Sequence, residues 1–281
     1  MARAKVVKSY QEEVVDRIFE LVKVNQKIWP RFMGVAGEKD NAYPLFSLTV
    51  GNLYDDNINR VVISAGIHGE EPAGVYALLK FLEEDIMDFC GDYAFLIFPC
   101  INPFGFERGY RFNKEGLDIN REFKAGTLCG EANAVMRALK RRGVRFECTV
   151  DLHETDPDWA SEGCKPEDNP KEFYMWEVCP NKNLRVGNGV IKRLSSLVPV
   201  CVWDTIYQDI NSGGVIWYPE GCVNSVYAQR TTLEGFLADH FTPQSFTLET
   251  PCGWNMKRRV FAHRIALRDI LELKRQQKTS A

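Results

Sequence analysis

The fold is decided by the stretch Arg60-Val-Val-Ile-Ser-Ala65-Gly-Ile-His68-Gly-Glu-Glu71-Pro72. Its residues 61–65 form a short run of apolar and small side chains without polar alternation, which is typical of a strand buried on both faces. A tight loop follows, and Pro72 suits the first turn of a helix. Apolar residues then recur at helical spacing as far as Phe89. A buried strand that leads through a tight loop into an amphipathic helix is a building unit of an α/β sheet.

The rest of the chain continues this alternation. Strands that alternate with helices predict an α/β fold, with a mixed, mostly parallel twisted sheet and helices on both faces. The sequence has neither an internal repeat nor a long linker, so we expect a single domain over residues 1–281. Strands are expected at 45–50, 93–99, 146–152, 198–203 and 245–248, helices at 11–26, 131–142 and 255–274, a long loop at 155–171, an N-terminal helix with its connection at 1–40, and a frayed tail at 275–281.

Composition excludes several functional classes. The chain carries 35 Lys and Arg against 38 Asp and Glu, a formal charge of −3, so no basic excess favours nucleic acid or an anionic membrane. No apolar run approaches the roughly 18 residues of a spanning helix, and no apolar signal region follows the first charges. The nine cysteines are odd in number and include no Cys-x-x-Cys pair, so we expect mostly reduced thiols and a cytoplasmic protein.

Two of the four histidines occupy the same position relative to a predicted strand. His68 follows the strand at 61–65, and His153 follows the strand at 146–152. Side chains just past the carboxyl ends of strands line the ligand crevice of an open α/β sheet. Glu71 lies three residues after His68 and can turn to the same side. Two imidazoles and one carboxylate form the ligand set of a catalytic zinc site with one open position, although a single His near a strand end is more often structural.

The segment between these histidines carries a resemblance. It reads Asn102-Pro-Phe-Gly105, and further on Arg111-Phe-Asn113-Lys-Glu-Gly116-Leu-Asp118-Ile-Asn120-Arg121. Together with the His-x-x-Glu loop and a later strand ending in His, this order resembles the zinc carboxypeptidase family, the carboxypeptidase A/B clan that includes the aspartoacylase and succinylglutamate desuccinylase branch. The resemblance extends from about residue 61 to about residue 249. It implies a zinc carboxypeptidase-like, phosphorylase/hydrolase-type fold with one Zn²⁺ per chain, held by His68, Glu71 and His153.

The resemblance also implies roles for polar residues of that segment. Asp118 would accept a hydrogen bond from the far ring nitrogen of His68, which orients the ligand and raises its basicity. Arg111 would face the scissile carbonyl oxygen and stabilise the charge that develops there. Asn120 and Arg121 would hold a substrate carboxylate, since the planar guanidinium binds carboxylates in bidentate fashion.

Two late segments compete to supply the general base. Thr231-Thr-Leu-Glu234 continues into a loop or the start of a helix, whereas Ser245-Phe-Thr-Leu-Glu249 resembles the family's late strand and precedes a long helix. We therefore expect Glu249 to be the base. Tyr207 resembles the mobile tyrosine that covers a bound carboxylate, in a loop about two residues longer than the family's. Ile216 would then lie near the pocket for the terminal side chain.

The resemblance implies a zinc-dependent metallopeptidase of carboxypeptidase type. Its substrate would be a peptide with a free C-terminal carboxylate, cleaved by zinc-activated water with a Glu general base. A deacylase of N-acyl amino acids, as in the aspartoacylase branch, is the first alternative. That branch carries a β domain after its catalytic core, whereas about 32 residues follow Glu249 here, which favours the peptidase. A zinc-binding module without catalysis is the second alternative.

Overall fold

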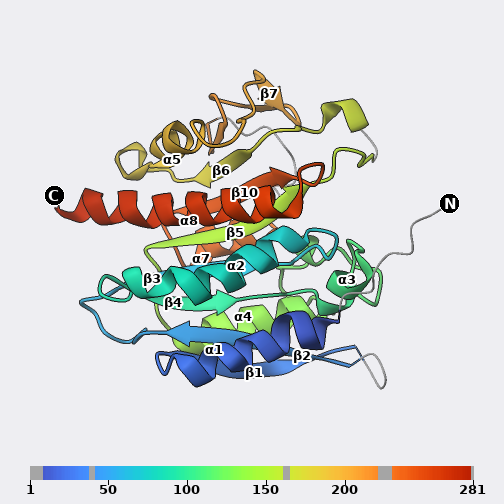
Figure 1. Cartoon of the computed structure of the whole chain (residues 1–281), viewed down its shortest axis with the longest axis vertical. Helices are drawn as coiled ribbons and strands as arrows, with labels where there is room; N and C mark the ends of the chain where they lie inside the picture. The colour runs from blue at the N-terminus through green and yellow to red at the C-terminus, as the bar shows by residue number, and fades with distance from the viewer. Residues whose placement is uncertain (1–8, 38–41, 161–164, 221–229, 280–281) are drawn as a thin grey trace.

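The computed structural model describes residues 9–37, 42–160, 165–220 and 230–279. An eight-stranded sheet runs through the centre in the order β1-β2-β4-β3-β5-β10-β6-β9 (Figure 1). Four neighbouring pairs, β3/β4, β3/β5, β5/β10 and β6/β9, are parallel, and the other three are antiparallel. The strands are β1 (Ile28–Ala36), β2 (Tyr43–Val50), β3 (Asn59–Ala65), β4 (Tyr93–Phe98), β5 (Cys148–Thr155), β6 (Tyr174–Val178), β9 (Val215–Tyr218) and β10 (Ser245–Pro251).

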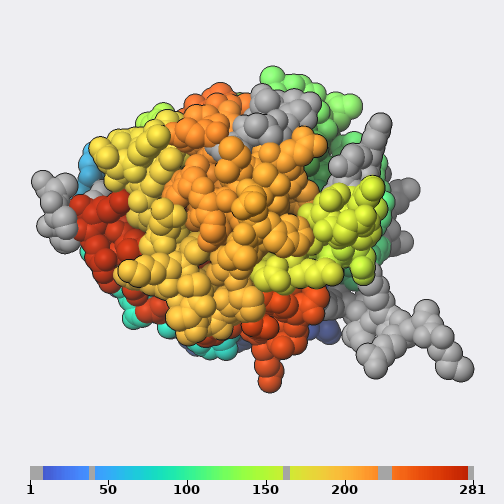
Figure 2. All heavy atoms as spheres, turned by 90° about the horizontal axis from the view of Figure 1, so that it is seen from above, coloured from blue at the N-terminus to red at the C-terminus, as the bar shows by residue number. Residues whose placement is uncertain are grey.

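Helices cover both faces of this sheet, as the sequence predicts. Helices α1 (Arg17–Val24), α2 (Pro72–Glu84) and α8 (Met256–Thr279) lie in front of it in Figure 1, and α4 (Gly130–Arg142) and α7 (Leu233–His240) lie behind. Helix α5 (Gly187–Leu194) packs on α8, and α3 (Pro103–Arg108) follows β4. A small hairpin of β7 (Thr205–Ile206) and β8 (Asp209–Ile210) belongs to the segments that cover the β9 end of the sheet (Figure 2).

The two helical layers explain the apolar run of β3. Val61 and Ile63 are fully buried in the hydrophobic cluster that includes residues of α2 and α8, whereas Val62 is fully buried in the cluster that includes residues of α4 and α7. Successive side chains of a strand point to opposite faces, so a strand covered on both sides needs apolar residues at every position. This burial fixes the register of β3, and with it the position of the loop that carries His68.

Several predicted elements differ from the structure. Residues 198–203 form no strand, because only Val200 bridges to another segment and Val202 and Trp203 are exposed. The strand expected at 146–152 is β5, which continues to Thr155, so His153 lies within a strand rather than after it. The tail is not frayed from 275 onward, because α8 continues to Thr279.

Some strands were not expected from the sequence. Strand β1 contains Pro30 and Gly34 and has a register shift between Phe32 and Gly34, features that a strand at the edge of a sheet tolerates. Strand β6 includes the buried Glu177, whose carboxylate accepts hydrogen bonds from the backbone of residues 186 and 187. A charged residue in the middle of a short segment interrupts its apolar pattern, so hydrophobicity alone does not predict the buried strand.

The sequence analysis expected neither a membrane-spanning helix nor a full set of disulfides. Among the described helices, none combines the length and apolar character needed to cross a membrane. None of the seven cysteines in the described ranges is part of a disulfide.

Candidate active site

The loop after β3 is held in a tight conformation by glycines. At Gly69 an added Cβ would lie 2.0 Å from the backbone carbon of Gly105, so the loop packs directly against the start of α3. The loop closes with a hydrogen bond of 3.3 Å from the Glu71 amide to the His68 carbonyl, and Pro72 begins α2. This turn places the side chains of His68 and Glu71 next to each other.

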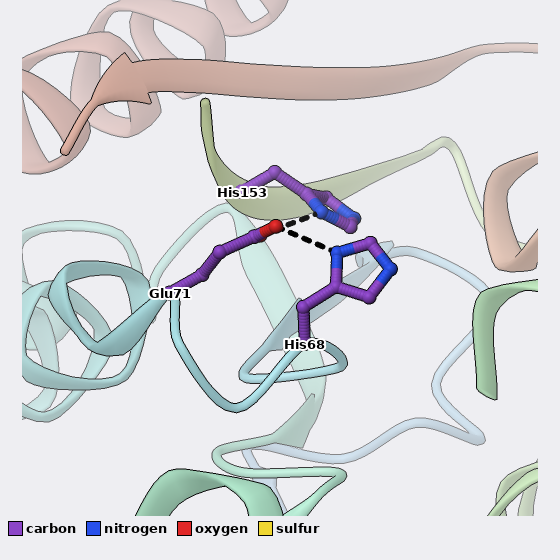
Figure 3. A group of neighbouring side chains, drawn as sticks. All are labelled: His68, Glu71 and His153. Atoms are coloured by element: carbon purple, nitrogen blue, oxygen red, sulfur yellow. Dashed lines mark hydrogen bonds and ion pairs between the residues drawn. The ribbon is translucent and has the colours of Figure 1, made fainter. Parts of the chain in front are cut away.

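His68, Glu71 and His153 meet at the carboxyl ends of β3 and β5 (Figure 3). The Nδ1 atom of His68 lies 2.7 Å from one carboxylate oxygen of Glu71, and the Nδ1 atom of His153 lies 2.9 Å from the other. All three side chains are buried, and one ligand atom from each lies within 4.8 Å of the others. The structure thus brings together the three residues predicted to hold the metal.

Each imidazole is oriented by a carboxylate on its far side. The Nε2 atom of His68 lies 3.2 Å from Asp118, the partner expected from the resemblance. The Nε2 atom of His153 lies 3.0 Å from Asp151, which the sequence analysis missed. The sequence contained a signal for the contact between Asp151 and His153, because residues two apart on a strand point to the same face. With both Nε2 atoms occupied, both Nδ1 atoms face the centre of the cluster.

Charge in this cluster is balanced between acids and imidazoles. Burial disfavours the ionised form of Glu71, but the two neighbouring imidazoles hold its pKa below the usual range. Burial opposes protonation of His153, yet Asp151 and Glu71 raise its pKa well above that of free histidine. The buried carboxylates therefore require positive charge at the centre. Two nitrogens and one carboxylate fit a divalent ion, and this donor set favours zinc.

Arg111 reaches the same centre from the loop after α3. Its Nε and Nη2 atoms donate to Oδ2 of Asp118 at 3.2 and 3.0 Å, and Nη1 lies 3.7 Å from Glu71. The Trp159 ring lies against its guanidinium, with 4.9 Å from the carbon to the ring centroid. Asp118 and Trp159 together hold Arg111 in one orientation beside Glu71.

Asn120 and Arg121 follow Asp118 in a single helical turn at Ile119–Arg121. The Oδ1 atom of Asn120 accepts a hydrogen bond of 2.8 Å from the Leu233 amide at the start of α7. Because this bond fixes the side-chain amide, its NH₂ group points away from α7 and can donate elsewhere. Arg121 donates to the carbonyl of Asn120 at 2.9 Å and is partly exposed.

Glu249 lies on β10 directly beside His153 in the parallel register with β5. Its Oε2 atom accepts a hydrogen bond of 3.0 Å from the Thr155 hydroxyl, which is in turn 2.8 Å from the Tyr174 hydroxyl. Burial, with Glu71 and Glu234 nearby, raises the pKa of Glu249 to about 8. A carboxyl group with this pKa is largely protonated near neutral pH, so it could act as a base only when a cation bound beside it favours the ionised form.

The competing carboxylate, Glu234, lies in the first turn of α7, so of the two alternatives expected here, a loop or the start of a helix, the structure has the helix. It is buried, and burial raises its pKa, with His153 and Asp151 among its electrostatic neighbours. Both candidate bases therefore lie near the metal cluster. Glu249 alone of the two stands on a sheet strand that pairs with the strand of His153.

Tyr207 stands at the tip of the β7–β8 hairpin. Tyr207 and Gln208 have φ of +50° and +71°, a conformation unusual for side chains of this size. The Tyr207 hydroxyl donates to Oδ1 of the buried Asn169 at 2.8 Å, and Nδ2 of Asn169 donates to the Trp159 carbonyl at 2.7 Å. Ile216 is fully buried in β9, in a cluster with aromatic residues of β6.

The chain is similar to known proteins in part of its sequence and in its fold. Residues 57–165 match the family model of the succinylglutamate desuccinylase/aspartoacylase catalytic domain, a segment that includes the three predicted metal ligands. No curated protein sequence matches the chain.

Solved structures share the fold. A protein of Shewanella amazonensis assigned as a metallopeptidase has a TM-score of 0.72 and 22% identity, with 93% of each chain covered. A metallo-carboxypeptidase from Burkholderia cenocepacia has a TM-score of 0.64 and 18% identity over 93% of this chain and 68% of that one. A metallo-carboxypeptidase from Pseudomonas aeruginosa, in complex with (2-guanidinoethylmercapto)succinic acid, has a TM-score of 0.62 and 17% identity over 94% and 69%. The predicted fold class is confirmed.

Proposed function

We propose that this chain, whose matched segment and fold support the zinc carboxypeptidase-like family with its succinylglutamate desuccinylase/aspartoacylase branch, is a zinc-dependent hydrolase of carboxypeptidase type. It would cleave the peptide or amide bond next to a free C-terminal carboxylate. The proposal is carried by one observation: His68, Glu71 and His153 converge at the carboxyl ends of β3 and β5, with Glu249 on the adjoining strand.

His68, Glu71 and His153 would hold the ion, which when bound supplies Lewis acidity and lowers the pKa of water. Glu249 would take the proton of the attacking water and pass it to the leaving nitrogen. The Thr155 hydroxyl donates to one oxygen of Glu249, which orients the carboxylate and leaves its other oxygen to accept that proton.

Three polar side chains would bind the substrate. Arg111, held by Asp118, would stabilise the negative charge that develops on the carbonyl oxygen. The NH₂ group of Asn120 and the guanidinium of Arg121 would bind the terminal carboxylate. Such fixed donors cost little reorganisation when the charge forms, because they are oriented before the substrate arrives.

Tyr207 would cover the bound carboxylate. In the structure its hydroxyl is engaged with Asn169, so covering the substrate requires this hydrogen bond to break. The left-handed backbone at Tyr207 and Gln208 supports a functional constraint on this hairpin, because strained conformations concentrate at sites that bind or move.

A deacylase of N-acyl amino acids is the second candidate, favoured by the family match over residues 57–165. Its substrate also has a C–N bond close to a free carboxylate, so the same residues would serve both reactions. The two candidates differ in what lies on the acyl side of the bond.

The test is a substrate panel followed by mass spectrometry of the products. It holds peptides with varied free C-termini, the same peptides amidated, and a set of N-acyl amino acids, each with zinc-loaded protein. Release of single C-terminal residues that amidation abolishes is the expected result. Cleavage of N-acyl amino acids alone would favour the deacylase instead.

Two variants identify the base. Glu249→Gln is expected to lose at least about 100-fold in turnover while its zinc content stays unchanged. Glu234→Gln removes the competing carboxylate on α7. If Glu234→Gln abolished turnover and Glu249→Gln did not, the assignment of the base would be wrong. A panel without any turnover would favour the zinc-binding module.

A further inference from the structure

A second cavity lies far from the metal cluster, between α4 and the edge strand β1. Its volume is about 420 Å³. Four strand spacings separate β1 from β5 in the sheet, or about 19 Å at the usual strand separation. The cavity therefore does not belong to the candidate active site, and Figure 1 shows β1 near the opposite end of the sheet from β6.

Five of the nine residues that line this cavity are cations, in a chain whose net charge is negative. Within the described ranges, none of the five is in an ion pair, and Arg142 donates instead to the Thr49 hydroxyl at 2.9 Å. Arginines elsewhere, such as Arg264, are paired with carboxylates. The five cations are Arg31, Arg137, Lys140, Arg141 and Arg142.

Stabilisation of helix α4 explains the presence of only some of these five cations. Cations in the last turn of a helix interact favourably with its dipole, which accounts for residues 140–142. Arg31 lies on β1, however, and Arg137 lies above the last turn of α4. Arg137 and Arg141 are four residues apart on one helix, a spacing at which like charges repel. An anionic ligand would relieve this repulsion.

The chemistry of the lining residues narrows the class of ligand that fits this cavity. Four of the five cations are arginines, whose planar guanidinium matches phosphate oxygens in bidentate fashion. The remaining lining residues, Phe32, Met33, Ala134 and Ala138, are apolar. The Phe32 ring lies on the α1 face of the sheet, because Phe32 pairs with Phe46, whose ring contacts Phe19 of α1. The volume is in the range of sites for small ligands. The cavity thus combines five cations with a small apolar wall.

We propose that the groove between β1 and α4 binds a small ligand with several phosphate groups, the chemistry of a polyphosphate. The phosphates would contact Arg137 and Arg141. The site is independent of the proposed hydrolase activity.

Calorimetric titration tests this proposal with three probes: ATP, inorganic tripolyphosphate and adenosine. The salt is about 0.15 M, because lower salt exaggerates surface electrostatics. Excess Mg²⁺ prevents the nucleotide from removing the active-site metal. We expect saturable ATP binding with a Kd below about 1 mM, and adenosine binding at least about tenfold weaker.

Surface substitutions assign the binding to the groove. Arg137→Glu and Arg141→Glu should each weaken ATP binding about tenfold or more, since each removes a charge-assisted contact. Lys192→Glu is the matched control, because Lys192 is an exposed cation in the last turn of α5. Phe32→Ala is a second control and should leave the binding of both ATP and tripolyphosphate unchanged, because the Phe32 ring lies on the α1 face of the sheet.

Four results would overturn the proposal. The first is no saturable binding of ATP or tripolyphosphate. The second is an equal loss in the Lys192→Glu control, which would indicate bulk charge rather than a site. Adenosine binding as tightly as ATP would show that the phosphates are not what the groove recognises. Displacement of ATP by an acidic peptide at a lower concentration would refute the phosphate class.

Discussion

Replacing Asp151 with Asn would test how the metal cluster is oriented. Asp151 accepts a hydrogen bond of 2.7 Å from Ser64 through one oxygen and holds Nε2 of His153 at 3.0 Å through the other. In Asp151→Asn the amide oxygen would stay with Ser64, so the NH₂ group would face the Nε2 proton. Two donors cannot pair, and the imidazole would move its proton to Nδ1, the nitrogen that we propose binds the metal.

The expected loss is about 10- to 100-fold in zinc affinity, the usual effect of removing a hydrogen-bonding partner from a metal-ligating histidine. That corresponds to about 1.4 to 2.7 kcal/mol. Competition against a zinc chelator of known affinity measures the loss, and circular dichroism shows whether the variant is folded. Ser64→Ala is the matched control, since it keeps the carboxylate and should change zinc affinity by less than about threefold.

The reasoning would be refuted if folded Asp151→Asn bound zinc as tightly as the original protein. It would also fail if Ser64→Ala lost as much affinity, because the effect would then come from packing around β3 and β5. Turnover should fall together with zinc occupancy, and excess zinc should restore part of it.

Three further predictions concern the loop, the buried histidine and the hairpin. Gly69→Ala places a Cβ 2.0 Å from the backbone of Gly105, so thermal unfolding should show a loss of about 2 kcal/mol or more, and an unchanged Tm would contradict the close packing. Burial lowers the pKa of His263 to about 3, so the unfolded chain takes up a proton that the folded chain refuses between about pH 6.5 and 3, and stability falls in that range as pH decreases. His263→Gln should remove about 1.4 kcal/mol per pH unit from this fall in acid denaturation curves, and parallel curves for both proteins would count against it. Tyr207→Phe loses the hydroxyl that bonds to Asn169 and should raise KM severalfold for substrates with a free carboxylate, whereas an unchanged KM would exclude Tyr207 from substrate binding.

The central strands could be predicted because burial on both faces forces a uniform apolar composition. Strands β3 and β4 have this composition, and their bounds are close to those expected. Strand β1 lies at an edge and carries Pro30, so its pattern resembles a connection. Strand β6 contains the buried Glu177, whose partners come from a later turn. Local composition cannot reveal a strand whose polar residue is satisfied by distant segments.

The residues of the candidate site also fall into those that the sequence could predict and those that it could not. His68, Glu71 and His153 could be proposed because His68 and Glu71 follow β3 and His153 lies near the end of β5, and the sheet brings such ends together. Asp151 was within reach of the same reasoning and was missed. The partners of Glu249 could not be predicted in this way, since Thr155 contacts Glu249 only through the register of β5 against β10. Side-chain pairs of this kind depend on strand order, which a pattern of hydrophobicity does not specify.

The single side-chain amide of Asn169 links the β7–β8 hairpin to the segment of Trp159. Its oxygen accepts from the Tyr207 hydroxyl, and its nitrogen donates to the carbonyls of Pro157 and Trp159, whose ring lies on Arg111. Under the proposed function, a Tyr207 that turned toward a substrate would release the oxygen of Asn169, while the bonds of its nitrogen could remain. Binding of the terminal carboxylate would then loosen the support of the segment that lies on Arg111. One side chain would thus couple the tyrosine that covers the carboxylate to the arginine proposed to face the reacting carbonyl.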